Sequence, residues 1–109
     1  MEQPNDPSSK VAIGARLQLL RERFELSGKE MADAAGLAAS SSITQWEKGD
    51  TTIAWENAIR LCKRFGVTMD WIYRGDIGSL PGNVYERLYG KRDGKPAVGR
   101  RARPFSAAE

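Results

Sequence analysis

The stretch from Ser27 to Gly49 constrains the fold most, because it contains start and stop signals for two short helices in close succession. Ser27 followed by Glu30 matches a capping box, in which each side chain satisfies a backbone N–H that the first helical turn leaves free. Gly36 marks the end of the first helix, since glycine enters the left-handed cap conformation without a Cβ penalty. The second helix is expected to begin near Ser40 and to end at Gly49. The sequence therefore predicts two helices joined by a tight turn.

The second helix of this pair carries a polar face made of hydroxyls, one amide and one cation. Such groups read base edges in DNA, and glutamine can pair bidentately with adenine. A polar helix braced by a second helix is typical of helix-turn-helix DNA recognition, although an ordinary helical hairpin with a solvated face gives the same pattern. The polar face consists of Ser41, Thr44, Gln45 and Lys48, and the apolar face of Ala39, Ile43 and Trp46.

The composition excludes several classes of function. The 109 residues include no histidine, which removes histidine-based acid/base catalysis, the Ser-His-Asp triad and the common zinc sites. No convergent set of Asp, Glu or Lys replaces them, so we expect no enzyme, no metal and no cofactor. The single cysteine, Cys62, excludes an internal disulfide framework and indicates a reducing compartment. No apolar run approaches the ~18 residues that a membrane-spanning helix needs. We therefore expect a cytoplasmic protein without a membrane partner.

Apolar residues recur at helical spacing along most of the chain, which predicts an all-α fold. A helix is expected from an N-cap at Ser9 to about Glu25, and another follows the central pair. A short fifth helix is expected after Thr68, with Trp71 and Tyr73 partly exposed. The expected buried stripe of the fourth helix is Trp55, Ala58, Ile59, Cys62 and Phe65.

The basic residues gather at the C-terminal end of the chain. Residues 1–9 carry two acids and no base, residues 10–76 carry ten bases and nine acids, and residues 77–109 carry seven bases and three acids. The overall charge of +3 thus divides into −2, +1 and +4. The basic tail is expected to be disordered. It serves either as a solubilising segment or as an arm that follows the DNA backbone or enters the minor groove.

These observations divide the chain into four expected parts. The parts are a disordered N-terminal arm (1–8), a five-helix domain (9–76), a C-terminal extension with a short helix or dimer contact (77–90) and a basic, disordered tail (91–109).

Five segments between about residues 10 and 75 carry a family resemblance through their order and spacing. They are IGARLQLLRE, SGKEMADAAG, SITQWEKG, WENAIRLCKRFGV and TMDWIYRGD. Together they resemble the phage-repressor/Cro-type (XRE-like) helix-turn-helix transcriptional regulators. The resemblance implies a compact five-helix DNA-binding domain in which the third helix lies in the major groove.

The resemblance also implies roles for single residues. It places base-reading side chains at Ser40, Ser41, Thr44 and Gln45, and phosphate contacts at Ser27, Gly28, Lys29, Lys48, Thr51 and Arg21. A helix N-terminus such as that at Ser27 presents free N–H donors and a partial positive charge to a phosphate. The family also pairs an arginine with a glutamate to tie the first helix to the third. Here that pair is Arg21 and Glu47.

Two features depart from the family pattern. Gly28 stands where the family often has glutamine, so one side-chain contact is missing and the helix start is weakened by roughly 0.5–1 kcal/mol. The link from Gly36 to Ile43 is one residue longer than usual, which leaves the cap of the third helix open among Ala38, Ala39 and Ser40.

The sequence therefore favours a sequence-specific regulator that binds double-stranded DNA at an inverted repeat, as a repressor or autoregulator and as a homodimer. No small-molecule ligand is expected. The dimer contact is expected at Trp71, Tyr73, Tyr85 and Leu88. The alternative is an antitoxin-like or adaptor module that uses the helices to bind a protein, with an interface centred on Trp55, Trp71 and Tyr73.

Overall fold

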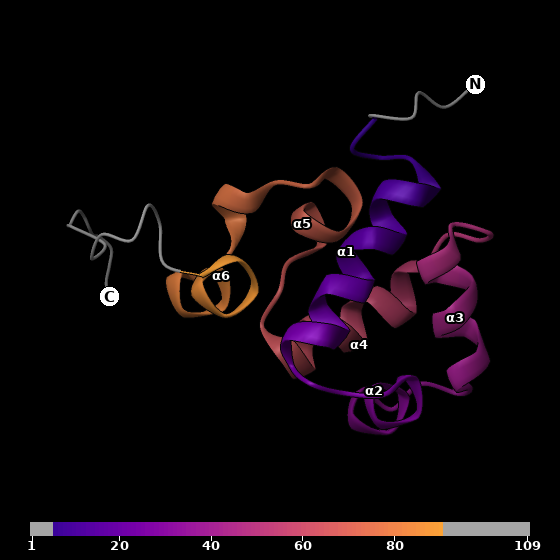
Figure 1. Ribbon diagram of the computed structural model, residues 1–109. Coiled ribbons are helices and arrows are strands. Elements are labelled where there is room, and N and C mark those ends of the chain that lie inside the picture. The colour runs from indigo at the N-terminus through magenta and orange to yellow at the C-terminus, as the bar shows by residue number, and fades with distance from the viewer. Residues whose placement is uncertain (1–5, 91–109) are drawn as a thin grey trace.

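The computed structural model describes residues 6–90, which form six α-helices and one short 3₁₀ helix and contain no strand (Figure 1). The predicted all-α fold is confirmed: five helices were expected in residues 9–76, and the sixth lies in residues 77–90, where a short helix or a dimer contact was expected. Residues 1–5 and 91–109, including most of the expected arm and the whole basic tail, lie outside the described residues. The elements are α1 (Lys10–Arg23), α2 (Gly28–Ala35), α3 (Ser40–Lys48), α4 (Trp55–Phe65), α5 (Met69–Arg74), η1 (Ile77–Ser79) and α6 (Gly82–Tyr89).

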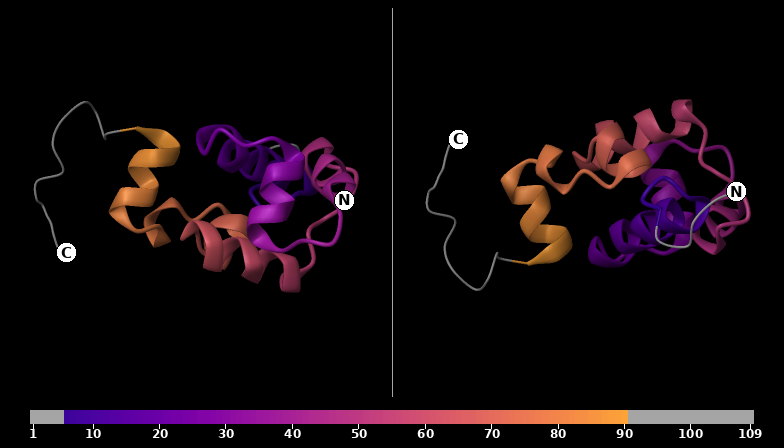
Figure 2. Two further views of the ribbon diagram at one scale, coloured as in Figure 1. Left: turned by 90° about the horizontal axis from the view of Figure 1, so that it is seen from below. Right: turned by 90° about the horizontal axis from the view of Figure 1, so that it is seen from above.

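Helix α1 lies at the centre of the fold and packs against α3, α5 and α6 (Figure 1). Its fully buried Leu17 and Leu20 join core residues from the other helices. The two views of Figure 2 place α6 at the end of the molecule opposite α3. Within residues 6–90, no helix combines the length and apolarity needed to cross a membrane. The fully buried partners from other helices include Met31, Ile43, Leu61, Trp71 and Ile72.

The C-terminal extension belongs to the core, which differs from the expected boundary at residue 76. Leu80, Val84 and Leu88 are buried against the bundle because α6 folds back over α1. The side chain of Trp71 is 0% exposed, and its indole Nε1 donates a hydrogen bond to the Tyr89 hydroxyl at 3.0 Å. The expected partial exposure of Trp71 is therefore wrong.

The covering helix also changes the expected dimer contact. Trp71 and Leu88 are buried within one chain and cannot meet a second copy, whereas Tyr73 and Tyr85 are half-buried. Arg87 fastens α6 to the end of α1, since its Nε donates to the Arg23 carbonyl at 3.0 Å and its guanidinium lies 4.4 Å from the centre of the Phe24 ring. The apolar residues that follow the first five helices therefore belong to the same hydrophobic core as those helices.

Two positions expected on buried faces are exposed. Trp55 is 61% exposed, because the buried face of α4 is formed by Ala58, Leu61 and Phe65 and the first residue of the helix lies at its edge. Ala39 is exposed because it is the N-cap residue of α3 and precedes the first helical turn.

The N-terminal segment is ordered from Asp6, although residues 1–8 were expected to be disordered. The Asp6 carboxylate accepts a hydrogen bond from the Ser8 N–H at 2.8 Å, and the Asp6 carbonyl accepts one from the Ser9 N–H at 3.0 Å. Arg16 holds this turn against α5, because its guanidinium donates to the Pro7 carbonyl and, at 3.1 Å, to the Ile72 carbonyl. Burial lowers the pKa of Arg16 from its usual value.

Candidate nucleic-acid interface

Helices α2 and α3 form the expected pair around a tight turn. The Ser27 hydroxyl accepts from the Glu30 N–H at 3.1 Å, and the Glu30 carboxylate accepts from the Ser27 N–H at 2.8 Å, which completes the capping box. Gly36 ends α2 in the left-handed conformation at φ 74°. In the link that follows Gly36, which is one residue longer than usual, Ala39 is the N-cap residue of α3. No side-chain hydrogen bond caps that helix. The first turn of α3 therefore has N–H groups that no capping side chain satisfies.

The outer face of α3 is exposed along its whole length, whereas Ile43 and Trp46 are buried on the inner side. This arrangement follows from helical spacing, since the two apolar residues are three positions apart and face α1 together. A rigid inner face and a polar outer face allow the helix to present side chains to a groove without unfolding. The exposed residues are Ser40, Ser41, Thr44, Gln45 and Lys48.

The N-terminus of α2 presents backbone donors beside this face. Within residues 6–90, the N–H groups of Gly28 and Lys29 have no hydrogen-bond partner, whereas the Ser27 N–H is satisfied by Glu30. Free N–H groups at a helix N-terminus favour an anion such as phosphate. The Lys29 ammonium lies 3.0 Å from the Asp33 carboxylate, and both side chains are largely exposed. Such a surface pair contributes little to stability, so Lys29 can exchange Asp33 for a phosphate.

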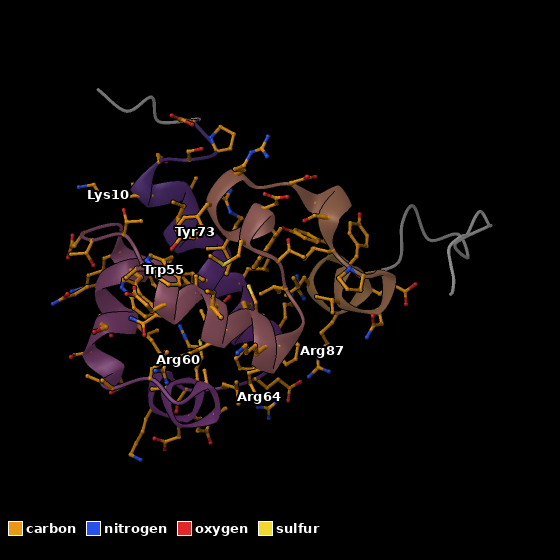
Figure 3. The ribbon with its side chains drawn as sticks, turned by 180° about the vertical axis from the view of Figure 1, so that it is seen from behind. Lys10, Trp55, Arg60, Arg64, Tyr73 and Arg87 are labelled. Carbon is orange, nitrogen blue, oxygen red and sulfur yellow. The ribbon has the colours of Figure 1, made fainter. Side chains whose placement is uncertain are left out.

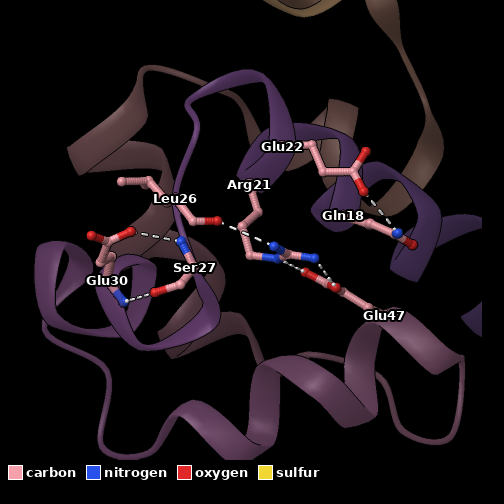
Figure 4. A network of polar contacts seen from close by, with 7 residues as sticks. All are labelled: Gln18, Arg21, Glu22, Leu26, Ser27, Glu30 and Glu47. Carbon is pink, nitrogen blue, oxygen red and sulfur yellow. Dashed lines mark hydrogen bonds and ion pairs between the residues drawn. The ribbon is translucent and has the colours of Figure 1, made fainter.

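Arg21 and Glu47 join α1 to the end of α3 by a two-pronged ion pair (Figure 4). Arg21 Nε donates to Glu47 Oε2 at 2.7 Å, and a terminal nitrogen donates to Oε1 at 2.9 Å. The other terminal nitrogen donates to the Leu26 carbonyl at 3.1 Å, next to the N-cap of α2. The hydrogen bonds to Glu47 raise the pKa of Arg21 above its usual value. One guanidinium therefore sets the positions of both helices of the pair.

Sequence reasoning missed Gly14, which sets how closely α1 approaches α3. Gly14 is buried in the middle of α1, and a Cβ there would lie 2.0 Å from the Trp46 carbonyl oxygen and 3.1 Å from that of Glu47. A glycine inside a strongly periodic helix was the available signal, because its conformational freedom lowers helix stability unless packing requires it. Gly14 thus helps to place the C-terminal end of α3.

Replacing Gly28 with glutamine should strengthen DNA binding. No atom lies within 4 Å of a Cβ built at Gly28, so the side chain fits without moving its neighbours. Glutamine would restore the donor that the family often has there and raise stability by up to about 1 kcal/mol relative to glycine. We expect a higher melting temperature and about threefold tighter DNA binding in a fluorescence titration. Gly82→Gln, at a second glycine with open space, is the control and should leave DNA affinity unchanged.

Within residues 6–90, no group of three or more Cys, Asp or Glu side chains is placed to hold a metal ion. A shallow hollow of about 350 Å³ lies between α2 and α3, and its walls include Leu37, Ala38 and Ser41. The arrangement is suited to contact with a large, polar surface.

Comparison with protein-family models matches residues 14–76 to a family described as a helix-turn-helix domain. The matched range is more than half of the chain and extends from Gly14 in α1 to Asp76 after α5. It includes the whole α2–α3 pair and the Arg21–Glu47 ion pair. A search of curated proteins and a search of solved structures each returned no match.

Proposed function

The chain belongs to the XRE-like helix-turn-helix family of DNA-binding transcription regulators, and we propose that it recognises a specific double-stranded DNA sequence as a repressor or autoregulator. In this proposal α3 lies in the major groove. The main supporting observation is that the two faces of α3 differ. Ile43 and Trp46 are buried in the core, and every outer side chain is exposed. Regulators of this family are generally not enzymes.

The proposed readout divides between bases and phosphates. Ser40, Ser41, Thr44 and Gln45 reach base edges as donors and acceptors. No arginine, the residue that most often reads guanine, occurs on α3. DNA shape therefore carries part of the specificity. The proposed phosphate contacts are Ser27, Gly28, Lys29, Lys48, Thr51 and Arg21.

The charge distribution of residues 6–90 also favours local contacts with phosphates over a general electrostatic attraction to DNA. Residues 6–90 carry eleven basic and eleven acidic side chains, so the described part of the chain is neutral overall. Attraction to the DNA backbone then depends on how charges and free N–H groups are placed. The N–H groups of Gly28 and Lys29 on one side of α3, and Lys48 and Thr51 on the other, would meet two stretches of backbone.

Gln45 is the residue proposed to contribute most to base reading. It is exposed, lies on the side of α3 opposite Ile43, and has an amide that can both donate to and accept from adenine. Gln45→Ala should cost about 1–3 kcal/mol at one base pair and relax the preference there. Affinities for a set of operators altered at single positions would show this. Equal weakening on every sequence would make Gln45 a backbone contact instead.

We also propose that two copies act together on an inverted repeat. One reading helix covers only a few base pairs, so useful specificity needs two half-sites about 34 Å apart, or a multiple of that distance. Selection of bound sequences from a random DNA pool tests both parts of the proposal. An enriched inverted repeat supports sequence-specific binding by a pair of copies.

The same experiment separates DNA recognition from the alternative, a protein-interaction module. Binding through phosphates weakens steeply as salt rises, because condensed counterions are released. A pool that yields no enriched sequence would favour the alternative. A measured affinity for DNA that does not change with salt concentration would also favour the alternative.

A further inference from the structure

A second hollow lies where the ends of α1 and α4 meet α6. Its volume is about 590 Å³, and its apolar walls are Phe24, Phe65 and Val84. The two phenylalanine rings pack edge to face, with their centres 5.0 Å apart. Small-molecule sites usually measure about 300–1,000 Å³ and combine apolar walls with a few polar groups. The hollow therefore has the size and the lining of such a site.

An arginine stacks on each of the two rings. The Arg87 guanidinium lies 4.4 Å from the centre of the Phe24 ring, and the Arg64 guanidinium lies 5.3 Å from the centre of the Phe65 ring. Figure 3 shows the two arginines reaching the same region of the molecule from α4 and α6. Stacking orients a planar guanidinium on the ring and leaves the N–H groups at its edge able to bind an acceptor.

Most of these N–H groups have no acceptor. Arg87 Nε donates to the Arg23 carbonyl at 3.0 Å. Within residues 6–90, the terminal nitrogens of Arg87 and the whole guanidinium of Arg64 have no hydrogen-bond acceptor and no carboxylate partner. Glu86 lines the hollow without forming an ion pair with either arginine. Because a carboxylate can accept two N–H groups of a guanidinium at once, the hollow is suited to an anion joined to an apolar group.

The surroundings of the hollow favour a small molecule over a macromolecule. The large apolar side chains that are exposed in residues 6–90 are Val11, Trp55, Ile77 and Tyr89, and none of them lines the hollow. A protein partner would therefore find no exposed apolar anchor beside it. A DNA backbone would contact the guanidiniums but would not use the apolar walls.

We propose that this hollow binds a small aromatic carboxylate and that the bound molecule tightens DNA binding. Its ring would pack against Phe24 and Phe65, since aromatic rings attract one another in edge-to-face and offset arrangements. Its carboxylate would accept hydrogen bonds from Arg64 and Arg87. Sequence analysis predicted no small-molecule ligand, and the proposal departs from that expectation because the hollow combines three segments that are distant in the sequence.

The link from α1 to α2 connects the hollow to the proposed DNA-facing surface. After Phe24 comes Glu25, the one residue other than glycine among residues 6–90 with a positive φ, at 58°. Such a conformation persists only where the surroundings hold it. The next two residues are Leu26, whose carbonyl is bound by Arg21, and Ser27, which caps α2. A ligand packed on Phe24 would hold this link, and with it the start of α2, in the conformation that binds DNA. This effect on DNA rests on the proposed function.

A titration without DNA tests the site. The full chain is titrated with 3-phenylpropionate while the Nε–H resonance of Arg87 and the backbone N–H resonance of Gly90 are followed by NMR. We expect saturable shifts with a Kd of about 1 mM, the strength expected of so small a ligand, while the Trp55 indole resonance stays in place. The absence of saturable shifts up to about 10 mM would overturn the proposal.

Two further probes test the chemical class of the ligand. 3-Phenylpropionamide keeps the ring without the charge, and acetate keeps the charge without the ring. Each should bind at least about tenfold more weakly than 3-phenylpropionate, because each loses one of the two kinds of contact. Equal binding of either probe would overturn the assignment to an aromatic carboxylate.

Arg64→Gln tests the charged contact without detaching α6, since Arg64 forms no hydrogen bond within residues 6–90. Loss of this guanidinium should weaken binding of 3-phenylpropionate about tenfold. Arg74→Gln, at an exposed arginine of α5 that pairs with Asp70 on the surface, is the matched control and should bind the probe as tightly as the unaltered chain. Unchanged binding in the Arg64 variant, or equal weakening in both variants, would overturn the proposal.

The effect on DNA is measured separately, at constant ionic strength and with a DNA sequence selected by the chain. Addition of 3-phenylpropionate at about 5 mM, well above its expected Kd, should tighten DNA binding about fivefold, which is at the low end of usual coupling between sites. The Arg64→Gln variant should show a smaller change. An unchanged or weakened DNA affinity with the hollow occupied would overturn the regulatory part of the proposal. If no DNA sequence is ever selected, the proposed function fails, whereas the NMR titration still decides whether the hollow binds the carboxylate.

Discussion

Replacing Gly14 with alanine should destabilise the protein more than any other single-methyl change in the described residues. The new Cβ would lie 2.0 Å from the Trp46 carbonyl oxygen, so α1 and α3 must move apart. Both neighbours are helix backbone, and no flexible side chain can move aside to make room. Overpacking of a core costs about 1–3 kcal/mol and occasionally more, and a backbone clash belongs at the upper end.

A loss of about 3 kcal/mol lowers Tm by roughly 12–24 °C for a domain of this size. Thermal unfolding followed by circular dichroism measures the shift. DNA affinity should fall as well, because Trp46 and Glu47 lie at the end of α3, the proposed reading helix, where Gly14 contacts it. Gly28→Ala is the matched control, since it adds the same methyl group to a helical glycine with no atom within 4 Å. The control should keep or slightly raise Tm. Equal effects of the two changes would contradict the close approach of α1 and α3.

Local signals in the sequence were sufficient to predict most of the helices. The Ser27–Glu30 capping box and the stops at Gly36 and Gly49 depend on neighbouring residues, and the structure has all of them. The expected burial of Ile43 and Trp46 is likewise confirmed, because helical spacing alone places them on one face.

The prediction was wrong where distant parts of the chain decide the outcome. Trp71 was expected to be partly exposed on the short fifth helix, but α6, which comes from a later segment, covers it. Trp55 fits the apolar spacing of α4 as well as Ala58 does, and only the direction of the neighbouring helices separates them. Spacing defines a stripe on a helix but not the edge at which the core ends.

The candidate site shows the same division. Exposure of Thr44 and Gln45 follows from the period of α3, whereas the role of Gly14 depends on a crossing with a helix about thirty residues away. Ala39 as the N-cap of α3 could not be chosen from the sequence, because none of the alternatives gives a capping hydrogen bond in the structure. The base-reading and phosphate-contacting roles stay predictions, since they concern a partner.

Removing the carboxylate in Glu47→Ala should weaken both folding and DNA binding. The Arg21 and Glu47 side chains are only 23% and 12% exposed, and two hydrogen bonds join them. Loss of one partner from such a pair leaves the other charge partly buried, which costs about 2–3 kcal/mol. The Arg21 guanidinium would no longer be bonded to α3. Its hydrogen bond to the Leu26 carbonyl would lose the orientation that Glu47 gives it. We expect DNA affinity, measured where both proteins are fully folded, to fall by at least tenfold.

The double variant Arg21→Met/Glu47→Met separates packing from phosphate binding. Two apolar side chains of similar length can replace a buried ion pair with little change in stability. Tm should therefore return to within a few degrees of the unaltered chain. DNA affinity should stay low, and the slope of log K against log salt should fall by about 0.9, because the proposed phosphate contact of Arg21 is lost with the guanidinium. If the double variant instead binds DNA as tightly as the unaltered chain, with the same salt slope, then Arg21 acts only by packing α1 against α3. In that case the phosphate-contacting surface is confined to the start of α2 and the loop after α3.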